Sequence, residues 1–112
     1  MDTVLPLAKM IRRLFERWQL SVDDQTALLG GLDPRYLEEA LLGDLELQKR
    51  AEHLLEIHRC LRVIFPKNPD MAYHWVAQPN RTYDNRPPLE VMKRGFDGLE
   101  QVRRYLKAEL CR

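Results

Sequence analysis

Hydrophobic residues recur at intervals of three and four along much of this chain, a spacing that places them on one face of an α-helix. The first such stripe predicts a helix over residues 5–19, and its apolar members are Leu7, Met10, Ile11, Leu14, Phe15 and Trp18. The other side of this helix is basic and carries Lys9, Arg12, Arg13 and Arg17. A second long stripe predicts a helix over about residues 46–65, built on Leu47, Ala51, Leu54, Leu55, Ile57, Leu61, Ile64 and Phe65.

Capping and turn residues divide the rest of the chain into shorter helices. Ser21 has the pattern of an N-cap because Asp24 follows it by three positions. Further start and stop signals pair proline, glycine or a short polar residue, and they are Gly30-Gly31, Asp33-Pro34, Asn68-Pro69, Pro79-Asn80 and Pro87-Pro88. The shorter helices are therefore predicted over residues 22–30, 34–43, 70–78, 88–94 and 98–109, with a loop or turn at residues 81–86.

No segment alternates cleanly between apolar and polar residues, so no β-strand is predicted. The fold class is all-α, a compact multi-helix domain around one core. Residues 1–45 form a degenerate helix-turn-helix-like region in this interpretation. Residues 46–112 form the second region, and the two are expected to pack as one compact unit.

The helix-turn-helix interpretation rests on "QTALLGGLDPRYLEEALLGD", in which two short helices flank a glycine turn. A DNA-reading helix there would use Arg35 and Tyr36, supported by phosphate contacts from Arg12 and Arg13. Its charge opposes that role, because residues 21–46 hold seven acids against the single base Arg35. A plain helical hairpin is therefore the alternative.

Charge is unevenly distributed over the 112 residues, whose net charge is only +1. Residues 1–46 carry a net charge of −4 and residues 47–112 a net charge of +5. No apolar run approaches the ~18 residues of a membrane span. The charged start is unlike a signal peptide, so a cytoplasmic location is expected. The two cysteines, Cys60 and Cys111, are predicted to be reduced thiols.

Catalytic and metal-binding patterns are missing from the sequence. His53 and His58 are five residues apart on a predicted helix, about 140° around its axis, so they do not face one ligand. The single serine, Ser21, is better explained as a helix cap. We therefore predict no enzyme, no metal and no cofactor.

The second half of the chain contains an ordered set of short motifs. "IFP" at residues 64–66 is followed by Ala-x-x-Trp, by Pro-Asn, by "NRPPLEVMKRG" and finally by "LEQVRRYL". In this order the pieces resemble the C-terminal toxin-binding domain of the Xre/MbcA/ParS-like antitoxins, and the resemblance covers residues 25–108. The residues that carry the motif are Phe65, Pro66, Ala72, Trp75, Pro79, Asn80, Leu89, Met92, Gly95, Tyr105 and Leu106. Asn85 stands where the family often has glycine, and asparagine also tolerates a left-handed turn.

The resemblance implies an antitoxin of a type II toxin–antitoxin system. Its partner would be a RES-domain toxin that consumes NAD, and the antitoxin would bind the toxin and occlude its active site. Trp, Tyr and Arg are frequent interface anchors, and prolines lower the cost of ordering a binding segment. The candidate toxin-binding residues are Arg81, Tyr83, Arg86, Pro88, Arg94, Lys107 and Arg112.

Two alternatives stay open. Many members of this family dimerise and repress their own operon, so the chain could be a DNA-binding transcriptional autoregulator with operator DNA as its partner. It could also be a stand-alone homodimeric member without a toxin. Trp75 is expected to lie in the core rather than at an interface.

Overall fold

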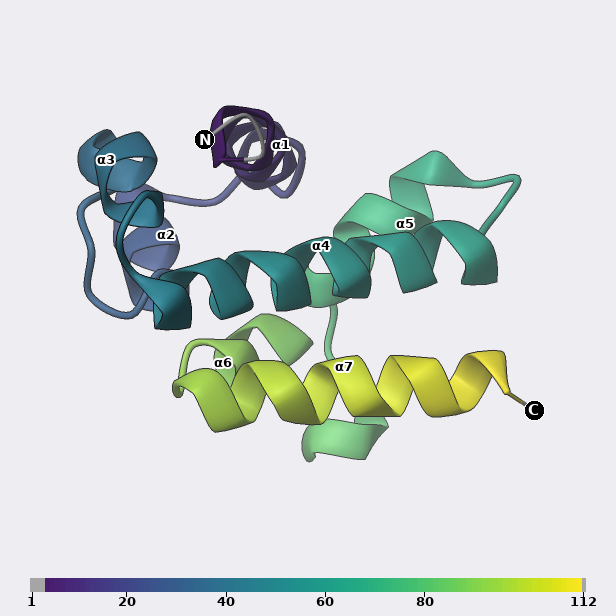
Figure 1. The fold of residues 1–112 in the computed structure, drawn as a ribbon. Coiled ribbons are helices and arrows are strands. Elements are labelled where there is room, and N and C mark those ends of the chain that lie inside the picture. Colours follow the sequence, from purple (N-terminus) through teal and green to yellow (C-terminus); the bar gives the residue numbers. More distant parts are fainter. Residues whose placement is uncertain (1–3, 112) are drawn as a thin grey trace.

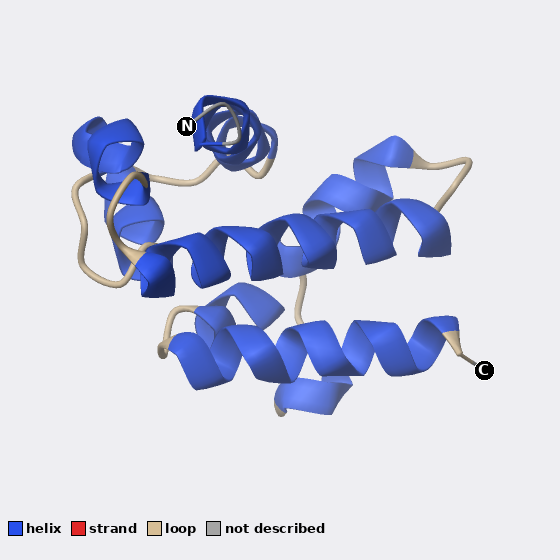
Figure 2. Cartoon of the chain, viewed as in Figure 1, coloured by secondary structure: helices blue, strands red, loops and turns tan. Residues whose placement is uncertain are grey.

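The computed structural model describes residues 4–111, and these form an all-α fold, as predicted (Figures 1 and 2). The α-helices are α1 (Val4–Arg17), α2 (Val22–Leu28), α3 (Leu37–Leu41), α4 (Leu45–Ile64), α5 (Pro69–His74), α6 (Pro88–Met92) and α7 (Phe96–Leu110). Three short 3-10 helices join them: η1 (Pro34–Tyr36), η2 (Trp75–Ala77) and η3 (Arg81–Tyr83). Within the described residues there is no β-strand, and the one isolated bridge joins Asn80 to Arg86.

The long helix α4 is the centre of the arrangement. It runs between α1 and α5 on one side and α7 on the other (Figure 1). The contact between α4 and α7 is the most extensive in the molecule, and α6 packs against the start of α7. The short helices α2 and α3 lie at the end of α4 where that helix begins.

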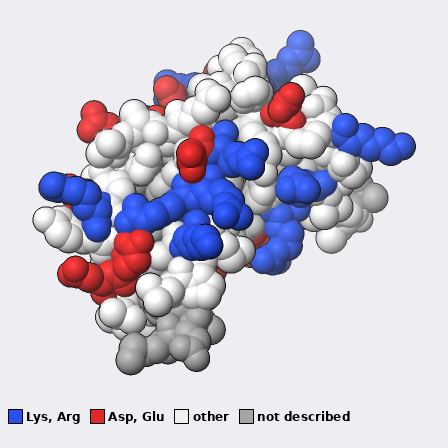
Figure 3. Space-filling view, turned by 90° about the horizontal axis from the view of Figure 1, so that it is seen from above, with Lys and Arg blue, Asp and Glu red and all other residues white. Residues whose placement is uncertain are grey.

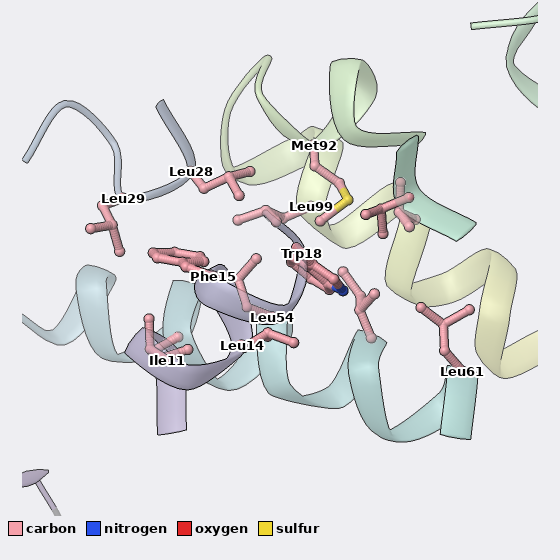
Figure 4. Close-up of a cluster of buried hydrophobic side chains, with 14 of the residues drawn as sticks. Ile11, Leu14, Phe15, Trp18, Leu28, Leu29, Leu54, Leu61, Met92 and Leu99 are labelled. Carbon is pink, nitrogen blue, oxygen red and sulfur yellow. The ribbon is translucent and has the colours of Figure 1, made fainter. Parts of the chain in front are cut away.

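One hydrophobic core joins the two halves of the chain. Ile11, Leu14 and Phe15 of α1, with Trp18 just after this helix, point toward residues of α2, α4, α6 and α7 (Figure 4). Burial of side chains of this size stabilises the fold by about 1.5–3 kcal/mol each, so the α1 stripe is a large contributor. No helix within residues 4–111 is both long and apolar enough to cross a membrane.

The predicted caps are confirmed. Ser21 Oγ accepts a hydrogen bond from the backbone N–H of Asp24 at 3.1 Å, and Asn68 Oδ1 accepts one from Met71 at 3.1 Å. Asp33 caps η1 in the same way. The first glycine of the Gly30-Gly31 pair has φ 75° and the second φ 99°, the left-handed region that ends helices.

Other details of the sequence-based interpretation are wrong. Met10 is 50% exposed although it lies on the predicted apolar stripe, and Ala8 is buried instead. The loop or turn predicted at residues 81–86, in contrast, is confirmed, and it contains the short helix η3 and is closed by the bridge between Asn80 and Arg86. The last helix begins at Phe96, two residues before the predicted start. Gly98 then lies inside α7, and a Cβ there would meet the backbone oxygen of Val91 in α6 at 1.9 Å.

Candidate functional site

Residues 80–86 form a loop that its own backbone holds closed, here called the 80–86 loop. The N–H of Asn80 donates to the carbonyl of Arg86 at 3.2 Å, and the N–H of Asn85 donates to the carbonyl of Asn80 at 2.9 Å. Asn80 Oδ1 also accepts a hydrogen bond from the N–H of Thr82 at 2.9 Å. Asp84 and Asn85 are both left-handed, with φ 58° and 64°, as expected for Asn85 at a position where glycine is common. The loop is thus shaped before any partner binds.

An aromatic ladder fixes this loop to the rest of the protein. Tyr83 packs edge-on against Tyr105 of α7 at a centroid distance of 5.9 Å, and Trp75 of η2 stacks on Tyr105 at 6.4 Å. Trp75 is half-buried and packs against the core, so it is neither fully interior nor freely exposed. The ladder places the loop against α7 on the side away from α4 (Figure 1).

Two of the candidate binding residues are buried in the free chain. Tyr83 is only 6% exposed, so its ring is not a surface anchor of the free chain. Pro88, at the start of α6, is buried as well. A tyrosine ring buries a large apolar area, and the Tyr83 ring buries this area against α7. Burial, with a smaller contribution from Tyr105, raises the pKa of Tyr83 to about 12.

The exposed cations of the site are Arg81, Arg86, Arg94 and Lys107. The first three form no ion pair with any of residues 4–111, and Arg81 and Arg86 both project from the 80–86 loop. Lys107 is paired with Glu56 of α4 and holds the pKa of that carboxyl below its usual value. Two residues after Tyr105 on a helix, it faces a different side from the ladder. Arg112 lies outside the described residues.

The four candidate DNA contacts have different surroundings in the structure. Arg12 forms two hydrogen bonds to the carboxylate of Glu38, and Arg35 is paired with Asp33 at 3.0 Å. Tyr36 is exposed, and the Arg35 guanidinium carbon lies 5.6 Å from the centroid of the Tyr36 ring. The helix that would read DNA is only the five residues of α3, preceded by η1. Arg13, in contrast, lines a pocket.

That pocket, of about 350 Å³, lies between α1, α4 and α5 and was not predicted. Figure 3 shows the face on which α1 and α5 lie, with Lys and Arg side chains gathered near its middle. The signal for it in the sequence is a pair of four-residue spacings, Arg13 with Arg17 and His58 with Arg62. No group of three or more potential metal ligands occurs within residues 4–111.

The fold and the 80–86 loop define a small all-α protein with a pre-shaped, cationic surface. Residues 60–109 match the family described as the antitoxin Xre/MbcA/ParS C-terminal toxin-binding domain. Over 102 residues the chain is 33% identical to an uncharacterized protein, y4oB, of Sinorhizobium fredii (strain NBRC 101917 / NGR234). That alignment covers 87% of this chain and 78% of the relative.

The chain belongs to this antitoxin family. It carries the toxin-binding domain of a toxin–antitoxin system, so a toxin protein is its partner. The matched region contains Trp75, the 80–86 loop and Tyr105, but neither Arg12 nor Arg35. Membership of an antitoxin family indicates a protein that acts by binding a toxin.

Proposed function

We propose that this protein neutralises a RES-type, NAD-consuming toxin in the cytoplasm by binding over the toxin's active site. The contact surface is the 80–86 loop with its two exposed cations, Arg81 and Arg86, extended by Arg94. In this proposal residues 46–112 bind the toxin, and residues 1–45 complete the core that supports them.

The observation that carries the proposal is the closed geometry of the 80–86 loop within the matched toxin-binding region. Because the loop is already ordered, binding does not have to fix its backbone, and less of the interaction energy is lost. Arg81 and Arg86 have no carboxylate partner among residues 4–111, so a partner's acids can pair with them. Arginine suits this role because its planar guanidinium binds carboxylates through two parallel hydrogen bonds.

A co-expression experiment tests the proposal. The chain is produced with a RES-like protein encoded in the neighbouring reading frame, and the mixture is passed over a size-exclusion column and assayed for NAD consumption. We expect one co-eluting complex and NAD loss reduced to background. Separate elution, or unchanged NAD consumption with the antitoxin in excess, would contradict it.

No observation favours operator binding as a second function. Arg12 and Arg35 are engaged by Glu38 and Asp33, and Glu39 adds a further negative charge on α3. Phosphate contacts depend on available cations, and η1 and α3 carry one, Arg35, which is already paired with Asp33.

A further inference from the structure

The pocket between α1, α4 and α5 places three guanidinium groups around one opening. Arg13 and Arg17 lie one turn apart on α1, and Arg62 lies on α4, one turn after His58. None of the three arginines forms an ion pair with a carboxylate of residues 4–111. Like charges at this spacing repel one another, so the free pocket holds uncompensated positive charge.

Aromatic contacts hold this charge in place. His58 of α4 stacks on Tyr73 of α5 with a centroid distance of 5.0 Å and an interplanar angle of 20°. The Arg17 guanidinium lies 5.7 Å from the centroid of the same Tyr73 ring. Burial, and after it Arg62, lowers the pKa of His58, so the ring is neutral at neutral pH and adds no fourth charge. Arg17 and Arg62 also lie in the last turns of their helices, where the helix dipole favours cations and offsets part of the repulsion.

The remaining walls of the pocket are apolar. Met10, Leu14 and Leu55 line it beside the arginines, which accounts for an exposed Met10 on an otherwise buried stripe. Methionine adapts its shape to a ligand because its side chain is unbranched and flexible. The volume of about 350 Å³ falls within the ~300–1,000 Å³ of small-molecule sites.

From this arrangement we infer that the pocket binds a small phosphorylated molecule, a phosphate ester with an organic body of about mononucleotide size. The phosphate lies among Arg13, Arg17 and Arg62, and the organic body covers Met10 and Leu55. A single carboxylate would leave most of the positive charge uncompensated, whereas a phosphomonoester carries nearly two negative charges and several acceptor oxygens. Inorganic phosphate alone would leave the apolar walls open to water.

This site is separate from the proposed toxin contact. Six of its eight lining residues, all but Arg62 and Tyr73, lie outside the matched residues 60–109, and none belongs to the 80–86 loop. If the ligand does not bind, the proposed toxin neutralisation is unaffected. If the toxin does not bind, the proposed ligand site is unaffected.

Calorimetric titration of the purified chain with AMP, pyrophosphate and adenosine tests the inference. We expect AMP to bind, pyrophosphate to bind more weakly and adenosine not to bind. Arg13→Gln and Arg62→Gln should each weaken AMP binding by about tenfold or more, since hydrogen bonds to charged groups are worth about 1.5–3 kcal/mol. Arg59→Gln, which removes an exposed arginine of α4 that does not line the pocket, should leave AMP binding unchanged.

A thermal melt gives an independent reading of the same site. At a concentration ~100-fold above its dissociation constant, AMP should raise the melting midpoint by about 10 °C in the wild type and by much less in Arg62→Gln. No AMP binding at millimolar concentration, or equal binding by wild type and both pocket variants, would overturn the inference. Duplex DNA that binds through these arginines while AMP does not would overturn it as well.

Discussion

Arg12 of α1 clasps the carboxylate of Glu38 on α3, with Nε 2.7 Å from Oε2 and Nη2 2.5 Å from Oε1. The same Nη2 donates to the carbonyl of Pro34 at 2.8 Å, so one guanidinium fastens α1 to both η1 and α3. The pair joins the basic side of α1 to the acidic helix α3. Arg12, a candidate phosphate contact, instead neutralises the charge of Glu38.

The Arg12–Glu38 pair predicts a specific loss of stability in acid. The hydrogen bonds from Arg12 hold the pKa of Glu38 at about 2, below its ordinary 4.5. Because the folded-state pKa is the lower one, the stabilisation is present above pH 4.5 and is lost as the pH falls toward 2. Both side chains are about 40% exposed, so solvent screening limits it to roughly 0.5–1 kcal/mol.

Urea denaturation at pH 7 and at pH 2 checks this. Glu38→Gln should be less stable than wild type at pH 7, and the two curves should converge at pH 2. Glu39→Gln, which alters the exposed neighbouring glutamate, should follow wild type at both values. An equal deficit for Glu38→Gln at the two pH values would mean that the ion pair is not its cause.

Tyr83→Phe should not destabilise the protein at neutral pH. Among residues 4–111 the Tyr83 hydroxyl has no hydrogen-bond partner although it is buried, and such a group costs about 1–3 kcal/mol. The phenylalanine variant should therefore equal or exceed wild type in unfolding free energy. A loss of more than about 1 kcal/mol would indicate that the hydroxyl makes a stabilising hydrogen bond.

The same residue predicts a loss of stability in alkali. The folded-state pKa of Tyr83, about 12, lies above its ordinary value of 10. The folded state therefore disfavours the ionised phenol, so stability is unaffected below pH 10 and falls as the pH rises from 10 to 12, by on the order of 2 kcal/mol. Denaturation at pH 9 and pH 11.5 should show this loss in wild type and in Tyr36→Phe, and a smaller loss in Tyr83→Phe. Equal losses in all three would rule out Tyr83 as the source.

Gly98→Ala should destabilise the protein by about 1–3 kcal/mol or more, because its Cβ would meet the Val91 carbonyl of α6 at 1.9 Å and the two helices would have to separate. Gly43→Ala is the matched control, since a Cβ there meets nothing within 4 Å. Thermal melts of the two variants measure the difference. A Gly98→Ala protein as stable as Gly43→Ala would show that α6 and α7 are less closely packed than described.

Local chemistry made much of this fold predictable. Ser21, Asp33 and Asn68 each combine a short polar side chain with a helix start, so their capping bonds follow from sequence alone. The apolar face of α1 is also predictable, because its hydrophobic residues recur at intervals of three and four. Asp44, which caps α4 by accepting a 3.0 Å hydrogen bond from the N–H of Leu47, carries the same signal but is absent from the predicted start signals.

The candidate site was less predictable because burial depends on the approach of distant segments. The sequence near Tyr83 does not indicate that its ring packs against Tyr105, which lies 22 positions later. Trp75 was expected in the core, but its position on Tyr105 leaves it half-buried. Arg81 and Arg86 remain exposed as expected, because their neighbours in the loop supply only backbone contacts.

The most direct test of the account is the affinity of the purified toxin for four versions of this chain, measured by calorimetry: wild type, Arg81→Glu, Arg86→Glu and Lys49→Glu. Lys49 is an exposed cation of α4 outside the matched region, so its variant makes the same charge change elsewhere. We predict that Arg81→Glu and Arg86→Glu weaken binding by about 30-fold or more, as interface hot spots of ~2 kcal/mol do, with circular dichroism and melting midpoint unchanged. Lys49→Glu should bind as wild type does. If Arg81→Glu and Arg86→Glu both bound the toxin with wild-type affinity, the 80–86 loop would not be the toxin contact.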